Sequence, residues 1–206
     1  MNVYVESGFV LTLALQQDDH PAADRLLQLA RNSTITLKIP AFSLSEPFAR
    51  LKYWANNRHR LVDELSKEIR ELGRTQPHQS MASELSRYAI QMASVLQTQM
   101  DAVEAIVVDI GHSCEIIQIN DAILTSASSF KTEYDMSPQD AIILASVISD
   151  LKQPDAPLES LFISQNVKDF EHPLIQDEFR RLNCKYLADF TNAVRFIERP
   201  TSEPAE

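Results

Sequence analysis

Residues 1–15, MNVYVESGFVLTLAL, place a short run of β-favouring residues directly before an acid, Glu6, which is followed by a second apolar stretch. Three similar short runs occur later, at residues 35–39, 161–164 and 185–187. Amphipathic segments with the spacing of helices lie between these runs. Because strands that alternate with helices are typical of α/β folds, the sequence predicts a short, mainly parallel sheet covered by helices.

The residues beyond this sheet are predicted to be helical, chiefly at about residues 43–107. Apolar residues keep the spacing of one helical face over residues 61–72 and 81–103, and the break between them contains Gly73 and Pro77. We therefore expect a long inserted antiparallel helical hairpin. Its apolar face is explained either by packing within the hairpin and against the core or by a homodimer interface.

The composition is that of a folded globular protein. The chain has 206 residues, 44% of them hydrophobic and 23% charged. We expect a single domain over residues 1–198 and a disordered tail at residues 199–206, which contain two prolines and no aliphatic residue larger than alanine. No basic signal segment opens the chain and no apolar stretch approaches ~18 residues, so we expect a cytoplasmic protein with no membrane span.

Several classes of site are excluded by residue counts. The three glycines are widely separated, so no glycine-rich loop for dinucleotides or phosphates is present. Two cysteines are too few for a cysteine zinc site, and the five histidines form no H-E-x-x-H pair. The formal net charge is ten negative, which argues against broad binding of nucleic acid, because phosphates are contacted by Lys and Arg.

Four acids are brought to one edge of the predicted sheet by its topology. In a parallel sheet with right-handed crossovers, strands end and crossover helices begin at the same edge. Glu6 follows the first strand, and Asp169 follows the strand that ends at residue 164. Glu46 and Asp140 are each expected in the first turn of a helix, the former because Pro47 next to it is tolerated there.

Acids clustered without matching bases repel one another unless cations neutralise them. Mg²⁺ and Mn²⁺ prefer such oxygen ligands and activate water for hydrolysis of phosphodiesters. Structural explanations stay open for three of the acids. Glu46 and Asp140 each stand three residues after a serine, Ser43 and Ser137, the spacing of a helix capping box, and Asp169 fits an ordinary turn.

These residues resemble the PIN domain, the fold of many metal-dependent ribonucleases, including the toxins of VapBC toxin–antitoxin systems. Glu6 in VYVESGFVL looks like the first acid of that family, Glu46 in LSE like its second, and Asp140 in SPQDAIILA like its third. Residues 161–170, LFISQNVKDF, are similar to the closing segment, in which Thr or Ser precedes the last acid and Phe follows it. The resemblance spans almost the whole chain.

The resemblance implies a three-layer α/β/α sandwich, an acidic pocket that holds Mg²⁺ or Mn²⁺, and endonucleolytic cleavage of RNA. Glu6, Glu46 and Asp140 would be catalytic by holding the metal directly or through water, and Asp169 would complete the pocket. The polar neighbours of these acids would be Ser7, Ser164 and Asn166. A toxin of this kind would also have an antitoxin protein as its partner.

Three features depart from the family. Glu6 stands where aspartate is usual, and a displacement of the carboxylate by about 1 Å can cost about a hundredfold in rate. The alternative function is therefore a catalytically weak or inactive PIN-fold module that binds RNA or protein. Asn166 occupies the position where some members carry the acid, so the fourth pocket residue is either Asp169 or Asn166. The long hairpin exceeds what the compact toxins carry.

Basic residues cluster modestly in the long helix, as Arg50, Lys52, Arg58 and Arg60. They either guide an RNA backbone towards the pocket or form a solvated helix face that pairs with the acids after it, and we favour the second explanation. Tyr53 and Trp54 beside them either stack on bases or pack within the fold.

Overall fold

Five parallel strands form one sheet in the order β3-β2-β1-β4-β5. The computed structural model describes residues 1–154 and 157–199. The strands are β1 (Asn2–Val5), β2 (Thr36–Pro40), β3 (Glu115–Ile117), β4 (Ser160–Ile163) and β5 (Cys184–Leu187). The prediction of an α/β fold with a parallel sheet is confirmed, and β1 lies at the centre of the sheet, so the acid that follows it stands in the middle of the carboxyl edge.

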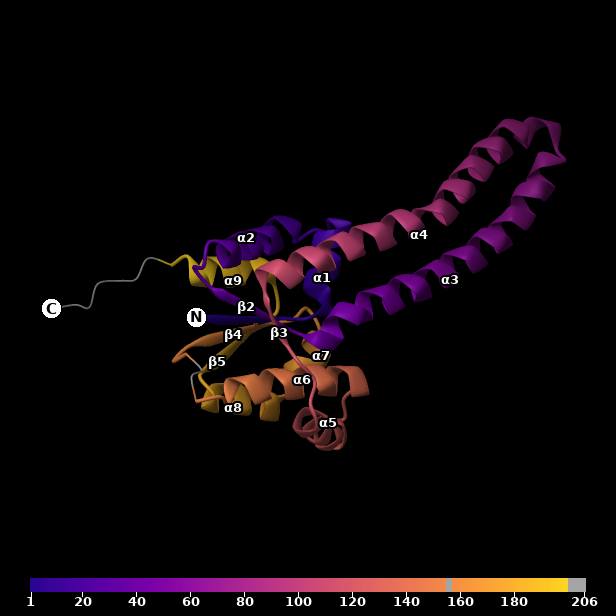
Figure 1. Ribbon diagram of the computed structural model, residues 1–206. Coiled ribbons are helices and arrows are strands. Elements are labelled where there is room, and N and C mark those ends of the chain that lie inside the picture. The colour runs from indigo at the N-terminus through magenta and orange to yellow at the C-terminus, as the bar shows by residue number, and fades with distance from the viewer. Residues whose placement is uncertain (155–156, 200–206) are drawn as a thin grey trace.

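Helices cover both faces of the sheet (Figure 1). One face carries α1 (Ser7–Leu15), α2 (His20–Arg31) and α9 (Phe190–Ile197), and the other carries α5 (Asp121–Glu133), α6 (Pro138–Leu151) and α8 (Pro173–Arg181). The short α7 (Val167–Phe170) lies between β4 and α8. Val3 and Val5 pack in the main core, which lies on the face covered by α1, α2 and α9. Tyr4 packs in a second core on the face covered by α5, α6 and α8, so β1 is buried along its whole length.

Strand β3 was not predicted. It has only three residues, none of them fully buried, and it directly follows the 35-residue helix α4 (Gln79–Ser113). Its place in the sheet comes from pairing with β2, where Ile116 is opposite Ile39. So short a run carries no periodicity of its own, and long-range pairing decides its structure.

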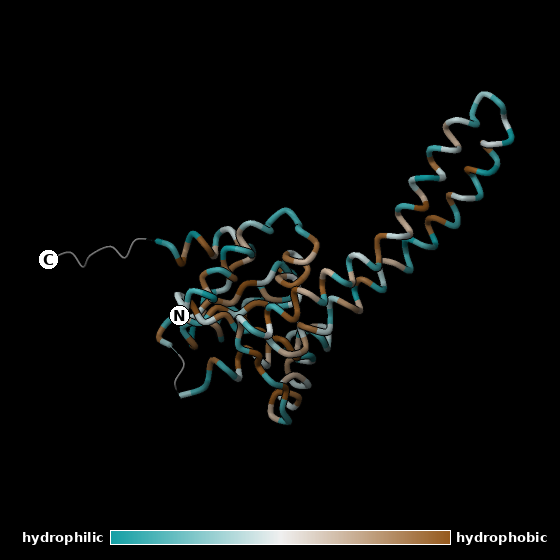
Figure 2. The backbone as a smooth tube through the Cα atoms, turned by 45° about the horizontal axis from the view of Figure 1, so that its top comes forward, coloured by the Kyte–Doolittle hydropathy of each residue, from teal (hydrophilic) through white to brown (hydrophobic). Residues whose placement is uncertain are grey.

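The hairpin consists of α3 (Ala41–Gly73), a 3₁₀ turn (Gln76–His78) and α4, so it begins and ends a few residues beyond the predicted limits. It projects from the sheet as a long arm (Figure 1), and Figure 2 shows hydrophilic residues around its tip. The arm has a small core of its own, in which Ile69, Ala82 and Ala89 are buried. At its base, Leu51 and Val103 belong to the main core instead.

The start of α3 differs from the sequence-based expectation. The helix begins at Ala41, so Pro47 lies in its interior rather than in its first turn. Ser43 is consequently inside the helix and cannot cap it, and its buried hydroxyl has no hydrogen-bond partner among the residues that the structure describes. The capping-box explanation of Glu46 is therefore wrong. Packing of Leu51 and other base residues against the core keeps this segment helical across the proline.

The start of α6 follows the predicted pattern. The hydroxyl of Ser137 accepts a 3.1 Å hydrogen bond from the backbone N–H of Asp140, and the Ser137 hydroxyl in turn donates to the Asp140 carboxylate. Asp140 thus has a structural role at the N-terminus of α6. With this role, the side chain of Asp140 still lies at the carboxyl edge of the sheet.

A network of charged and polar groups joins α6 to the sheet, away from the carboxyl edge where Asp140 lies. The hydroxyl of Tyr4 donates a 2.7 Å hydrogen bond to Asp150, and the Lys38 ammonium lies 2.9 Å from the same carboxylate and 3.1 Å from Glu115. Burial by itself would lower the pKa of Lys38, but its hydrogen bonds to these carboxylates outweigh that effect and raise it. The network joins β1, β2 and α6.

Two further expectations concern the ends and the environment of the chain. Apart from Arg199, the predicted disordered tail at residues 199–206 lies outside the described residues. Among the residues that the structure describes, no helix is long and apolar enough to cross a membrane.

Candidate functional site

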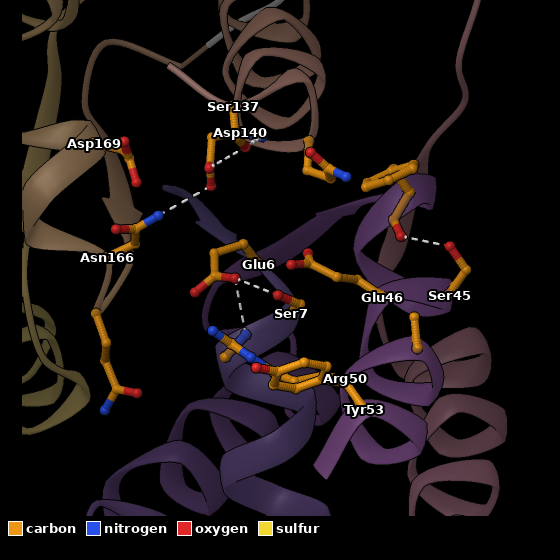
Figure 3. Close-up of a pocket in the computed structure, with 15 residues that line it drawn as sticks. Glu6, Ser7, Ser45, Glu46, Arg50, Tyr53, Ser137, Asp140, Asn166 and Asp169 are labelled. Atoms are coloured by element: carbon orange, nitrogen blue, oxygen red, sulfur yellow. Dashed lines mark hydrogen bonds between the residues drawn. The ribbon is translucent and has the colours of Figure 1, made fainter. Parts of the chain in front are cut away.

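A cavity of about 1000 Å³ opens at the carboxyl edge of the sheet. Five segments supply its walls: the β1–α1 junction, α3, the start of α6, the loop after β4, and α7 (Figure 3). The residues that line it are Glu6, Ser7, Gly8, Phe42, Ser45, Glu46, Ala49, Arg50, Tyr53, Ser137, Gln139, Asp140, Gln165, Asn166 and Asp169. All four acids placed at this edge from the sequence lie in the same cavity.

Glu6 is the most buried of these acids, with 8% of its surface exposed. Its Oε2 accepts hydrogen bonds from the backbone N–H of Gly8 at 2.9 Å and from the hydroxyl of Ser7 at 2.7 Å, so it caps α1. Burial raises the pKa of Glu6, while these two hydrogen bonds oppose the rise. The nearby carboxylate of Glu46 raises it further, and the guanidinium of Arg50 lowers it.

Gly8 allows this close approach. A Cβ atom at position 8 would lie 2.6 Å from Oε1 of Glu6, closer than non-bonded atoms approach each other. The glycine is therefore required by the position of the Glu6 carboxylate, not by its backbone angles.

Glu46 faces the cavity from α3. Its Oε2 is buried, and no hydrogen-bond donor reaches it within the described part of the chain. A buried carboxylate oxygen without a partner costs free energy, typically about 1–3 kcal/mol or more for a charged group. Such an oxygen favours a cation as its neighbour.

A chain of hydrogen bonds joins Asp140 to Glu6. The side-chain amide of Asn166 donates a 3.0 Å bond to Oδ1 of Asp140, and the backbone N–H of Asn166 donates a 3.1 Å bond to the hydroxyl of Ser164. That hydroxyl donates a longer bond, 3.4 Å, to Oε1 of Glu6. Ser164 and Asn166 therefore set the relative positions of two of the four carboxylates.

Asp169 reaches the cavity from the first turn of α7. Figure 3 shows its carboxylate on the same side of the cavity as Asp140, next to Asn166. Both candidates for the fourth pocket residue, Asp169 and Asn166, thus line the cavity. Asn166 is the one that is hydrogen-bonded to Asp140.

The carboxylates of the cavity suit a hard divalent cation, but they do not form a ready-made metal site. Four carboxylates line the cavity, and the orphaned oxygen of Glu46 is available to a cation. Within residues 1–154 and 157–199, however, no three Asp, Glu, His or Cys side chains already stand close enough together to hold a metal ion. The residues fit Mg²⁺ or Mn²⁺ by their chemistry, since both ions prefer oxygen ligands and Mg²⁺ is often held by one or two carboxylates with waters in its remaining positions.

The basic cluster is divided by the fold. Arg50 lines the cavity, whereas Arg58 donates a 2.8 Å hydrogen bond to Gln99 across the hairpin. Lys52 and Arg60 are exposed on α3 and are not among the residues that line the cavity. Trp54 is half-buried and packs against the main core, as is usual for a single tryptophan.

Six lining residues were not singled out as site residues from the sequence: Gly8, Phe42, Ser45, Ala49, Gln139 and Gln165. Gln139 and Gln165 are adjacent in sequence to Asp140 and Ser164, and that adjacency is the signal that marks them. Phe42 precedes the predicted start of its helix, so the misplaced helix boundary concealed it.

No protein-family model matches the chain, and no curated protein sequence matches it. Four chains of solved structures match, one of them in the crystal structure of VapBC2 from Rickettsia felis bound to a DNA fragment from their promoter. The similarity covers 91% of this chain and 98% of that chain at 13% sequence identity, with a TM-score of 0.43. A likeness this distant does not establish a shared fold.

Proposed function

We propose that this protein is a PIN-like, Mg²⁺- or Mn²⁺-dependent endoribonuclease. The observation that carries the proposal is the meeting of Glu6, Glu46, Asp140 and Asp169, from four separate segments, in one cavity at the carboxyl edge of a parallel sheet. Carboxylates brought together in this way repel one another, and one of them has an unpaired buried oxygen. A divalent cation relieves both costs.

Glu6, Glu46 and Asp140 would hold the metal, and Asp169 would complete the pocket. The metal, when bound, lowers the pKa of a water molecule and stabilises the oxygen that leaves phosphorus. The chain's own contribution is to orient the ligands. Ser137 and Asn166 engage both carboxylate oxygens of Asp140, so its rotamer is fixed before any substrate arrives.

The decisive experiment is cleavage of a labelled single-stranded RNA by the purified full-length protein. We expect cleavage with added Mg²⁺ or Mn²⁺, no cleavage with a chelator, and loss of activity in Asp140→Asn. Asp121→Asn is the matched control, because Asp121 also stands in the first turn of a helix but outside the cavity. Full activity in Asp140→Asn would refute the site.

The second candidate function is a PIN-fold binding module with weak or no catalysis. It is favoured by the commitment of Oε2 of Glu6 to capping α1, which leaves only Oε1 for other partners. Glu6→Asp separates the two functions. The enzyme requires an active wild type, whereas the binding module predicts an inactive wild type that gains cleavage when Glu6 is shortened.

A toxin role adds a protein partner that neutralises the nuclease. On this proposal, expression of the wild-type chain arrests growth of a bacterial host and expression of Asp140→Asn does not. Coexpression of the protein encoded beside it restores growth and yields a complex that copurifies. Arrest that is equally strong with Asp140→Asn would separate toxicity from the cavity.

A further inference from the structure

One face of α3 forms a wall of the cavity over three helical turns. The residues on this face recur every three or four positions: Phe42, Ser45, Glu46, Ala49, Arg50 and Tyr53. With a rise of about 1.5 Å per residue, the wall is about 16 Å long from Phe42 to Tyr53. It leads from the acidic edge of the sheet outwards along the base of the arm.

Arg50 is the one basic residue among those that line the cavity. Its guanidinium lies 5.9 Å from the ring centroid of Trp54, which is itself packed against the main core. Its positive charge also lowers the pKa of Glu6. Arg50 therefore lies at the acidic pocket beside an aromatic ring, whereas Lys52 and Arg60 are exposed on α3 and do not line the cavity.

Tyr53 stands one turn beyond Arg50 on the same face, and 64% of its surface is exposed. Figure 3 shows the two side chains reaching together from α3 towards the Glu6 side of the cavity. An aromatic ring exposed to this extent at the mouth of a polar cavity offers a flat apolar surface beside a guanidinium. That pair of groups matches the two parts of a nucleotide, its base and its phosphate.

We propose that Arg50 and Tyr53 form a nucleotide subsite, in which Arg50 binds a phosphate next to the scissile bond and Tyr53 stacks on the adjoining base. The proposal rests on the ribonuclease function proposed above and specifies its substrate. A base can stack on a side chain only when it is not stacked within a duplex, so the subsite selects single-stranded RNA. Arg50 also supplies the local positive charge that an acidic pocket otherwise lacks.

The test measures binding rather than cleavage. Full-length Asp140→Asn is the parent, and the probe is a short fluorescent single-stranded oligoribonucleotide, with Ca²⁺ in place of the catalytic metal. We expect Tyr53→Ala to weaken binding about ten- to a hundredfold and Tyr53→Phe to retain it, as for loss of one stacked base. Arg50→Gln should reduce the slope of log affinity against log salt by about 0.7, the value for one single-strand phosphate.

A direct signal of stacking comes from an oligoribonucleotide that carries 2-aminopurine. The parent should quench its fluorescence on binding, and Tyr53→Ala should not. The same sequence annealed to its complement should bind more weakly and be insensitive to position 53. Lys52→Ala is the matched control, because Lys52 is exposed on the same helix but does not line the cavity.

The outcomes distinguish failure of the subsite from failure of the function. Cleavage by the wild type together with unchanged RNA binding by Tyr53→Ala overturns the subsite and leaves the nuclease standing. Absence of both cleavage by the wild type and RNA binding by the parent overturns both. If Tyr53→Ala still binds RNA but no longer binds a copurifying protein, this face belongs to a protein partner and the subsite is overturned.

Discussion

The backbone N–H of Gly8 donates a 2.9 Å hydrogen bond to Oε2 of Glu6, and a Cβ at position 8 would stand 2.6 Å from Oε1 of the same carboxylate. The side chain of Glu6 therefore folds back over the first turn of α1. The length of the Glu6 side chain lets its carboxylate cap α1 through Oε2 while Oε1 stays within reach of Ser164.

Gly8→Ala is expected to displace the Glu6 carboxylate and to slow RNA cleavage about ten- to a hundredfold, the cost of a misplacement near 1 Å. The melting temperature should change little, since alanine favours the helix by about 1 kcal/mol and offsets part of the clash. Gly111→Ala is the control. A Cβ there meets nothing within 4 Å, so it should stabilise the protein and leave cleavage unchanged.

The stability of the protein should depend on pH through Glu6. The pKa of Glu6 in the folded state is raised above its usual value of 4.5, chiefly by burial. Its contribution to stability is thus fully present below pH 4.5 and is lost as the pH rises through the raised pKa. Glu6→Gln, which cannot ionise, should be more stable than the wild type near neutral pH.

Urea unfolding of the wild type and Glu6→Gln between pH 4 and pH 8 measures this effect, with the metal removed by a chelator. The two curves of unfolding free energy against pH should meet at the acidic end and separate as the pH rises. A constant difference between them would mean that Glu6 titrates normally in the folded protein.

Lys38→Met should destabilise the protein by about 1.5–3 kcal/mol, the range for a hydrogen bond to a charged group, because the largely buried Asp150 carboxylate loses the Lys38 ammonium and keeps the Tyr4 hydroxyl. The raised pKa of Lys38 makes its contribution fully present below pH ~10.5, the usual lysine value, and lost as the pH rises through the folded-state value. The difference between variant and wild type should thus shrink as the solution becomes strongly alkaline.

Chemical denaturation at pH 7 measures this loss, and the double variant Lys38→Met with Asp150→Asn is the control. It should recover part of the stability, since the unpaired charge is gone. A double variant no better than the single one would indicate that the packing of the lysine stem, rather than the ion pair, stabilises this region.

The outer part of the arm should be dispensable for folding. Its core of Ile69, Ala82 and Ala89 is separate from the main core. Replacing residues 62–95 by a short glycine-containing turn should leave the melting temperature within a few degrees of the wild type. A deletion of residues 73–103 should be far more damaging, because it removes Val103, which is fully buried in the main core.

The same shortened chain tests the homodimer interpretation of the hairpin. Met81, Tyr88, Met92 and Val95 are spaced as one side of α4 and are 36–54% exposed. If they form a dimer interface, the full chain sediments as a dimer and the shortened chain as a monomer. If the full and the shortened chain sediment in the same oligomeric state, this surface has no part in self-association.

The sequence predicted best those features that a local residue pattern determines by itself. Buried parallel strands read as short apolar runs, so four of the five strands were found, and the parallel topology then brought Glu6, Glu46, Asp140 and Asp169 to one edge without coordinates. The Ser137 cap at the start of α6 could also be predicted from the sequence, because it depends on a contact three residues away.

The failures concern features that distant contacts determine. Strand β3 is defined by its pairing with β2, and the interior position of Pro47 is sustained by packing at the base of α3. Neither contact is encoded within a few residues. The separation of Arg50 from Lys52 likewise required the orientation of α3, since the two differ only in which side of one helix they occupy.

Helix α3 is continuous from Ala41 at the cavity to Gly73 at the tip of the arm, and Pro47 is its one interior proline. Leu51, next to Arg50, is fully buried in the main core, so the segment that carries Arg50 and Tyr53 is anchored at the base of the arm. A single helix thus supplies both a wall of the cavity and one half of the arm, and the packing of its base fixes where that wall stands relative to the sheet.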